Sequence, residues 1–298
     1  LVNSNQEIRD DESRLFNVMA TPGYPELIGE MIALNNDRGL TAFIIGDSPF
    51  RLKSDGTTLN NWGNNTALAV EDNDDGLVSR DEYLGVFYPS LFTSDNAGNN
   101  VVVPPSHGIM RTFALSDQVS FPWFAPAGTR RGGITNASAA GFVDAEGEFK
   151  SIALNEGQRD TLYSLNINPI TFLTGAGLVN FGQKTRARNA SALDRINVAR
   201  LVIYLRSQLK KLAKPYIFEP NDKITRDEIK AQVDSLMLEL VSQRALYDFL
   251  VVCDESNNTP SRIDRNELYV DIAIEPVKAV EFIYIPLRLK NTGEIAGL

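Results

Sequence analysis

Three passages of this 298-residue chain hold residue types that could do chemistry, and the first is an acidic loop at residues 71–82. Numbered as a calcium loop, it places Glu71, Asn73 and Asp75 at positions 1, 3 and 5, and Glu82 at position 12. Position 1 departs from the EF-hand pattern, which has aspartate there, because glutamate is one methylene longer. A strand rather than a helix is predicted to follow. We therefore interpret the loop as a solvated acidic segment, with a weak calcium site as the alternative.

Two further passages come close to catalytic and nucleotide-binding motifs. Ser106 and His107 are adjacent, but their sequence context lacks the turn that exposes a serine nucleophile and brings a base to it. Residues 175–185 nearly form a phosphate loop, yet Gln183 displaces the lysine and the threonine by one position. The backbone amides would then not converge on one phosphate group. The sequence therefore predicts no enzyme activity and no cofactor.

Charge and composition narrow the range of partners. The formal net charge is −9, which disfavours an electrostatic grip on nucleic acid or on an acidic membrane. No apolar run approaches the roughly 18 residues that a membrane span needs, so neither class of partner is expected. Cys253 is the only cysteine, which excludes an internal disulfide and fits a reducing cytoplasm. With His107 as the only histidine, a zinc site would be hard to build.

Periodicity predicts a strand–helix–strand unit near the start of the chain. Residues 16–20 and 41–46 have strand character, and residues 26–35 between them have apolar positions near helical spacing. A right-handed crossover with parallel strands is the default for such a unit. Residues 83–92 are predicted as one further strand, and residues 134–150 as a surface loop.

Two long helices are predicted in the second half of the chain. The first ends at Lys214 and is amphipathic, with seven basic residues and one acidic residue between positions 188 and 214. This basic stretch is either a solvated helix face or a contact for an acidic partner. The second helix is predicted to open at Thr225 with a capping box that pairs Thr225 with Glu228.

The end of the chain is predicted as three strands, at residues 249–253, 268–274 and 280–289. Pro286 lacks a backbone donor, which places the third strand at a sheet edge. The tail after it has too little apolar surface to fold alone. An edge strand with a free tail is suited to join the sheet of another chain.

Residues 101–133 are predicted to cross between two packed bodies. An apolar run ends at Pro104 and Pro105, a serine and Gly108 follow, and an Ala-Pro-Ala-Gly sequence at residues 125–128 leads into two arginines. Each proline removes a backbone donor and fixes its own φ, so regular structure is interrupted at both ends of the segment.

This segment and four others, in the same order, resemble the tail sheath proteins of contractile-tailed bacteriophages, most closely the T-even-like branch. The others are a Pro-Gly turn at residues 21–25, the aromatic strand at 83–92, the glycine-rich passage at 155–185, and a Phe-Glu-Pro-Asn-Asp sequence at 218–222. Sheath proteins of this type are considerably longer. The resemblance therefore implies that this chain is the C-terminal part of one.

The resemblance implies a structural role. Such sheath subunits form six-membered rings that stack helically around a tail tube, and they contract to drive the tube through the host envelope. The implied partners are other copies of the chain, the tail tube protein, and the baseplate and tail terminator proteins. The implied location is the phage tail, assembled in the host cytoplasm. The sheath of a bacterial contractile injection system is the alternative, and a calcium-binding module is a more distant one.

Two sets of contact residues are expected from the resemblance together with the sequence pattern. The strand expected to be shared between subunits contains Val280, Phe282, Tyr284, Leu287 and Leu289. The residues expected to contact the tube are Arg200, Arg206, Lys210 and Lys211.

The expected fold class is α/β (or α+β), with a strand–helix–strand body and a C-terminal domain. That domain is expected to have two long helices packed on a short sheet, with an extended C-terminal strand or arm. By resemblance, residues 1–103 are part of an outer sheath domain that includes the acidic loop, and residues 104–298 form the C-terminal sheath domain.

Overall fold

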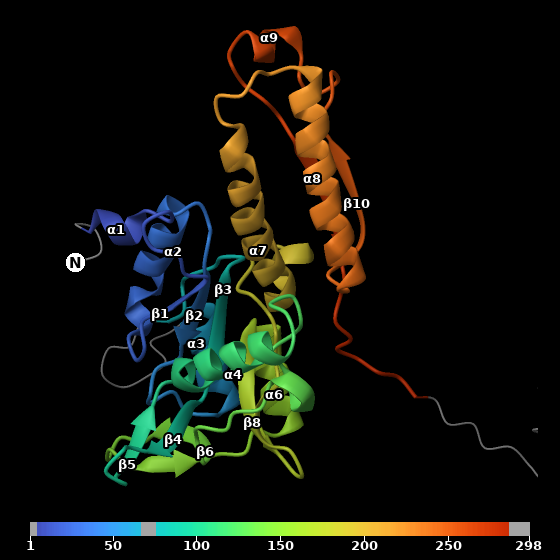
Figure 1. Ribbon diagram of the computed structural model, residues 1–298. Coiled ribbons are helices and arrows are strands. Elements are labelled where there is room, and N and C mark those ends of the chain that lie inside the picture. Colours follow the sequence, from blue (N-terminus) through green and yellow to red (C-terminus); the bar gives the residue numbers. More distant parts are fainter. Residues whose placement is uncertain (1–4, 67–75, 286–298) are drawn as a thin grey trace, which may run out of the picture.

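The computed structural model describes residues 5–66 and 76–285 and has the predicted mixed class of helices and strands. A body built on a five-stranded sheet carries a four-stranded sheet at one end, and a long helical hairpin projects from the other end (Figure 1). The hairpin packs on a two-stranded sheet that precedes the C-terminal segment. None of the described helices is long and apolar enough to cross a membrane.

The five-stranded sheet has the strand order β1-β2-β3-β8-β9, in which the first four strands are parallel and β9 is antiparallel to β8. Its strands are β1 (Val18–Ala20), β2 (Phe43–Asp47), β3 (Leu84–Tyr88), β8 (Ile167–Leu173) and β9 (Gly177–Asn180). The short η2 (Pro25–Leu27) and α2 (Ile28–Asp37) connect β1 to its parallel neighbour β2. The predicted strand–helix–strand unit is therefore confirmed.

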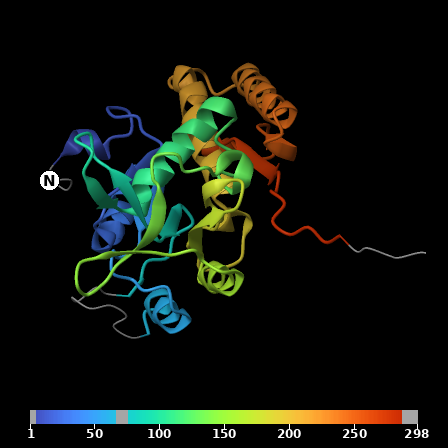
Figure 2. The ribbon, with the colours of Figure 1, turned by 90° about the horizontal axis from the view of Figure 1, so that it is seen from below.

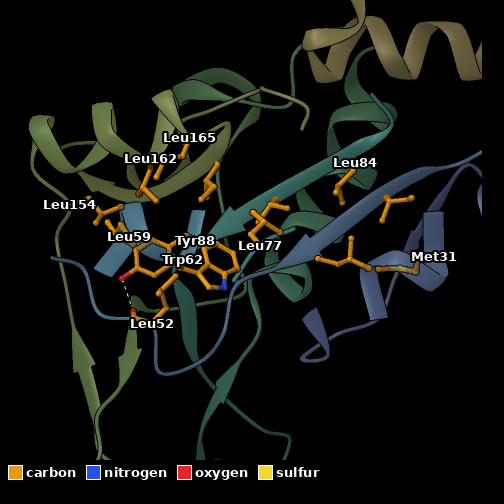
Figure 3. Close-up of a cluster of buried hydrophobic side chains, with 14 residues drawn as sticks. Met31, Leu52, Leu59, Trp62, Leu77, Leu84, Tyr88, Leu154, Leu162 and Leu165 are labelled. Atoms are coloured by element: carbon orange, nitrogen blue, oxygen red, sulfur yellow. Dashed lines mark hydrogen bonds between the residues drawn. The ribbon is translucent and has the colours of Figure 1, made fainter. Parts of the chain in front are cut away.

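Helices cover both faces of this sheet, so its central strands are buried. The helices on the first face are α2, α3 (Gly56–Asn64) and α6 (Glu156–Ser164), and those on the second are α4 (Pro105–Val119) and α7 (Ile196–Ala213). Ile44 of β2 enters the first core and Ile45 the second, because successive side chains of a strand point to opposite faces. Figure 3 shows the first core around Trp62 and Tyr88, whose hydroxyl donates to the Leu52 carbonyl at 3.0 Å.

The four-stranded sheet is antiparallel, has the order β5-β4-β6-β7, and corrects two predictions. Its strands are β4 (Ser90–Ser94), β5 (Asn100–Val103), β6 (Ala139–Val143) and β7 (Phe149–Ser151). Residues 83–92 do not form one strand, because Pro89 cannot continue a ladder and separates β3 from β4. Residues 134–150 are not a loop throughout, because they contain β6 and the start of β7. Pairing of β6 with β4 decides the conformation of small residues that carry little strand signal.

The C-terminal unit has the predicted arrangement of two long helices on a short sheet. Its elements are α7, η4 (Lys214–Tyr216), α8 (Lys223–Ser242), β10 (Leu246–Val252) and β11 (Asp271–Pro276). The two strands are antiparallel, and α8 lies against β10. Leu205 of α7, Met237 of α8 and Val251 of β10 belong to one hydrophobic cluster, which is separate from the two cores of the body.

Helix α8 begins earlier than predicted, and the predicted capping box is wrong. Asp222 is the N-cap, and its carboxylate accepts a hydrogen bond from the Thr225 amide at 2.9 Å. Thr225 therefore lies inside the first turn and is nearly buried there. An aspartate caps a helix as well as a threonine does, and here Asp222 occupies the N-cap position that was predicted for Thr225.

Residues 101–133 connect the body to the hairpin, as predicted. Phe113 of α4 lies in the second core of the body, whereas Trp123 lies in the hairpin cluster. The remaining short helices are α1 (Gln6–Arg9), α5 (Gly128–Arg131), η3 (Ala192–Asp194) and α9 (Pro260–Ile263). The five-stranded sheet takes strands from both sides of residues 103 and 104, and the division into domains at that point stays a prediction.

Candidate functional site

The proline- and glycine-rich motifs converge on one buried carboxylate at the end of β2. Asp47 accepts hydrogen bonds from the Ser106 amide at 2.7 Å, the Ser106 hydroxyl at 2.8 Å and the Gly23 amide at 3.0 Å. Burial raises the pKa of Asp47, and these hydrogen bonds oppose that rise. Asp47 thereby joins the turn after β1 to the first turn of α4. Gly108 is required nearby, because a Cβ there would lie 2.5 Å from a methyl carbon of Leu91.

The arrangement of Ser106 and His107 is not that of a serine nucleophile and its base. The Ser106 hydroxyl is buried and donates to Asp47, whereas His107 is exposed. Ser106 therefore holds the start of α4 in place rather than attacking a substrate.

The acidic loop falls mostly outside the described residues. Glu71, Asn73 and Asp75 lie outside them, and Glu82 is a half-exposed residue just before β3. Within the described ranges, there is no group of three or more side chains that could hold a metal ion. The solvated loop stays a prediction, and the weak calcium site stays its alternative.

The passage that resembles a phosphate loop contributes its polar groups to the protein itself. Lys184 Nζ donates to the Tyr163 carbonyl at 2.8 Å, and the Thr185 hydroxyl donates to the Leu193 carbonyl at 2.7 Å. The side-chain amide of Gln183 donates to the Glu281 carboxylate at 3.2 Å. These bonds make the passage a support for the segment that follows β11.

Glu281 anchors that C-terminal segment, defined here as residues 277–285. Arg195, which directly precedes α7, donates to both carboxylate oxygens of Glu281, at 2.6 Å from Nε and 3.0 Å from Nη2. Paired donation from a guanidinium to a carboxylate is among the stronger polar contacts in proteins. The contact joins residues 86 positions apart.

Sequence reasoning missed Arg195, Gln183 and Glu281 as functional residues. Two signals pointed to them in retrospect. Gln183 is the residue that interrupts the phosphate-loop pattern, and Glu281 is the one charged residue in the apolar run 279–287.

Around Glu281 the C-terminal segment exposes large apolar side chains. Val280, Phe282, Ile283, Tyr284 and Ile285 are all between 69% and 87% exposed. In Figure 2 the segment runs away from the body as an extended trace. The predicted strand at 280–289 is not formed in its described part, because a strand needs a partner edge; Leu287 and Leu289 lie outside the described residues.

The sheet nearest to this segment has room for further strands. Only β10 and β11 pair in it among the described residues, so each has one free edge. Tyr247 and Leu250 of β10 are exposed on its surface, at 64% and 62%. A sheet with free edges and apolar side chains can accept an added strand.

Of the expected tube-contact residues on α7, Arg200 is buried, Arg206 is half-buried, and Lys210 and Lys211 are exposed. Arg200 is 3% exposed, donates to Asp117 at 2.5 Å and lies 4.6 Å from the ring centre of Phe113. Arg206 donates to a backbone carbonyl at 3.0 Å. Lys210 and Lys211 are exposed, although Lys210 also donates to an acidic side chain at 2.7 Å.

These cations line a groove of about 850 Å³ between residues 11–17 and α7. Its apolar lining includes Phe16, Ile203 and Tyr204. Its charged lining is Arg38, Arg200, Arg206, Lys210, Lys211 and Lys214 against Asp11 and Glu12. Basic residues therefore outnumber acidic ones in a chain that is acidic as a whole, and the groove suits an acidic partner.

Comparison with known proteins identifies related sequences. Residues 189–290 match the family model of the phage tail sheath C-terminal domain. The chain is 40% identical over 199 residues to the tail sheath protein of Vibrio phage KVP40, and 34% identical over 200 residues to that of Enterobacteria phage T4. The alignments cover 65% and 66% of this chain but only 28% and 29% of the relatives, so the chain spans under a third of their length.

Solved structures show the same fold at low sequence identity. The helical sheath of the anti-feeding prophage (AFP) in the contracted state has a TM-score of 0.69 at 20% identity, over 92% of this chain and 70% of that one. The sheath complex of an extracellular contractile injection system, PVC, in the contracted state has a TM-score of 0.65 at 18% identity, over 84% and 64%. The resemblance drawn from five motifs is thus confirmed in sequence and in fold.

Proposed function

We propose that this chain, whose residues 189–290 match the phage tail sheath C-terminal domain, is the C-terminal part of a contractile tail sheath subunit of a T-even-like bacteriophage. The observation that carries the proposal is the identity of 34–40% to two phage tail sheath proteins over 199 and 200 residues. The role is structural, and no reaction is catalysed. The free energy for contraction lies in the packing of subunits against one another.

In this proposal, copies of the full-length protein form six-membered rings that stack helically around a tail tube. The stack shortens and drives the tube through the host envelope, and the baseplate and tail terminator proteins bind its two ends. The protein is a virion component assembled in the host cytoplasm. Support comes from relatives of the same fold, which include a helical sheath and a baseplate of the anti-feeding prophage.

The C-terminal segment is proposed to join neighbouring subunits. Val280, Phe282 and Tyr284, continued by Leu287 and Leu289, would add as a strand to the β10–β11 sheet of another copy. The exposure of the three described side chains and the free edges of that sheet support this pairing. Strand addition supplies backbone hydrogen bonds, and alternate side chains supply specificity.

The exposed end of α7 is proposed to contact the tube. Lys210 and Lys211 are the two candidates that are exposed. Arg200 is buried and Arg206 is half-buried, and both make contacts within the chain beside this surface.

The sheath of a bacterial injection system is the second candidate, because the AFP and PVC sheaths share the fold. Sequence identity favours the phage: it is 40% to the KVP40 sheath and 20% to the AFP sheath. The two candidates share one architecture and differ in the structure that the tube penetrates.

Electron microscopy of the full-length protein, expressed alone, tests the proposal. We expect hollow striated tubes with six-fold end views from the natural protein. Deletion of residues 280–298 should leave a folded protein by circular dichroism that forms no tubes, because the shared strand is lost. Normal tubes from the shortened protein would overturn the strand assignment, and dispersed monomers of the natural protein across salt and concentration would overturn the sheath.

A matched pair of substitutions separates the strand from a general effect of exposed apolar residues. Tyr284→Asp should abolish or severely reduce tube formation, because a charge would enter the shared sheet. Val119→Asp changes a residue of α4 that is 75% exposed and should leave tubes intact. Equal loss from both substitutions would speak against a role specific to the C-terminal segment.

A further inference from the structure

The C-terminal segment is anchored at two separate points among its described residues. Near its start, the Val277 amide donates to the Ala245 carbonyl at 3.0 Å, and the Asn197 side chain donates to the Val277 carbonyl at 3.4 Å. The second point is Glu281, four residues further on. Residues 278–280 between the two points are exposed.

The second anchor differs sharply from its neighbours in burial. The Glu281 side chain is 15% exposed, whereas Val280 is 78% exposed and Phe282 is 69% exposed. A charged residue is thus held against the body while the apolar residues on both sides stay in water. This pattern is the reverse of what the hydrophobic effect alone would produce, so the polar contact decides the path of the segment.

Arg195, Gln183 and Asp194 build the contact, and the Tyr163 side chain also lies against Glu281. Arg195 binds both oxygens of Glu281, and Gln183 donates to one of them. Asp194 in turn pairs with Arg195 Nη1 at 3.0 Å, which orients the guanidinium. The Arg195 side chain is 28% exposed, so water can reach the pair when it opens.

We propose that Arg195 and Gln183 act as positioning residues that form a latch for Glu281. The unanchored part of the C-terminal segment then has one length when the latch is closed and a greater length when it is open. With the latch closed, the free part begins at Phe282. With the latch open, it begins at Lys278, directly after the Val277 anchor. The four residues gained, 278–281, extend the reach of the segment by about 13 Å.

The latch can open without unfolding the body. The apolar side chains on both sides of Glu281 are already exposed while the latch is closed, at 78% for Val280 and 69% for Phe282. Opening therefore exposes little apolar area and resembles local release of a terminal segment. The consequence for assembly rests on the proposed function: a segment that links neighbouring subunits could follow a change in their spacing by lengthening. The latch itself is a property of the single chain.

Distance measurements between two spin labels test the latch in the whole 298-residue chain. The labels are placed at Val280→Cys, between the two anchors, and at Leu238→Cys on α8, both exposed positions. The natural Cys253 is buried and stays unlabelled in the folded protein. We expect a narrow distance distribution with the latch intact and one about twice as broad in Arg195→Gln, because the label then sits on a flexible tether.

Two further variants separate the latch from general loosening. Glu275→Gln removes an exposed acid of β11, upstream of both anchors, and should leave the distribution narrow. The charge exchange Arg195→Glu with Glu281→Arg should restore a narrow distribution that Arg195→Glu alone loses. A narrow distribution in Arg195→Gln, broadening in Glu275→Gln, or no rescue by the exchange would each overturn the proposal.

The outcome is independent of tube formation. If the label distances behave as expected but the full-length protein forms no tubes, the latch stands and the proposed function fails. If tubes form and Arg195→Gln leaves the label distribution narrow, the function stands and the latch fails. Thermal unfolding of each variant confirms that the body remains folded during the measurement.

Discussion

Asp47 ends β2 and accepts three hydrogen bonds while its side chain is almost fully buried. Loss of water around the carboxylate raises its pKa, and the donors on Gly23 and Ser106 oppose that rise without cancelling it. The folded chain therefore binds this proton more tightly than the unfolded chain does. This difference links the free energy of unfolding to pH at a single residue.

Asp47→Asn removes the titrating group and should change that pH dependence. An unfolded aspartate ionises near pH 3.9, roughly its unperturbed value, and the folded Asp47 ionises at a higher pH. Between those two values the unfolded state binds fewer protons. The free energy of unfolding of the natural protein should then fall with rising pH, relative to Asp47→Asn, by up to about 1.4 kcal/mol per pH unit.

Urea unfolding of both proteins over the range from about pH 4 to about pH 7 measures this difference. A difference that is the same at every pH would show that Asp47 does not titrate differently in the two states. A difference that grows with pH would mean that the hydrogen bonds outweigh burial.

For single residues, the sequence shows which ones are unusual but not which of them are in contact in the folded chain. Ser106 belongs to a recognisable motif, yet its partner Asp47 lies 59 positions earlier in the chain. Gln183 shows only as the residue that interrupts a phosphate loop, and its contact with Glu281 spans 98 positions. Local patterns carry no information about such long-range convergence, which is why the latch could not be predicted.

For helices and strands, periodicity predicts the structure where the apolar residues of an element lie on one face and that face packs against the core. Helices α2, α7 and α8 follow from apolar residues at helical spacing. Prediction fails where pairing between distant strands decides the conformation. The small residues of β6 gain their strand conformation from β4. Residues 280–285, the described part of the predicted strand at 280–289, pair with no other strand of the described chain.

Trp123 forms a contact between the crossing segment and the hairpin, in addition to the packing of α7 on the body. Its ring packs edge-on against Tyr204 of α7 with centroids 5.2 Å apart, and its Nε1 donates to the Gln243 carbonyl at the end of α8 at 3.2 Å. Asn197 of α7 donates to the Trp123 carbonyl. One residue of the crossing segment therefore contacts both helices of the hairpin.

Trp123→Ala should lower the free energy of unfolding by about 3–5 kcal/mol, because it leaves a cavity in the hairpin cluster and removes the link to Gln243. Urea unfolding measures the change. Leu238→Ala on the exposed side of α8 is the control and should alter stability by less than about 0.5 kcal/mol. Similar values for the two variants would show that Trp123 does not hold the hairpin to the body.

At the scale of the whole molecule, a groove along α7 carries an excess of positive charge in a chain that is acidic overall. The net charge is −9, yet the groove along α7 is lined by six basic and two acidic residues. In this groove Asp11 pairs with Lys210, and Glu12 pairs with Lys214. Such exposed pairs contribute little to stability, so an acidic partner can compete for the lysines at small cost.

Neutralising Lys210 and Lys211 together should therefore weaken binding of the assembled protein to its tail tube by about tenfold and leave assembly itself intact, because charges at a contact rim act on association more than on folding. Cosedimentation of tubes with the natural protein and with Lys210→Gln/Lys211→Gln measures the effect. It should be largest at low salt, where screening is weakest. Lys53→Gln, at an exposed position on the body, is the control. Equal binding by the double variant and the natural protein at low salt would move the tube contact away from α7.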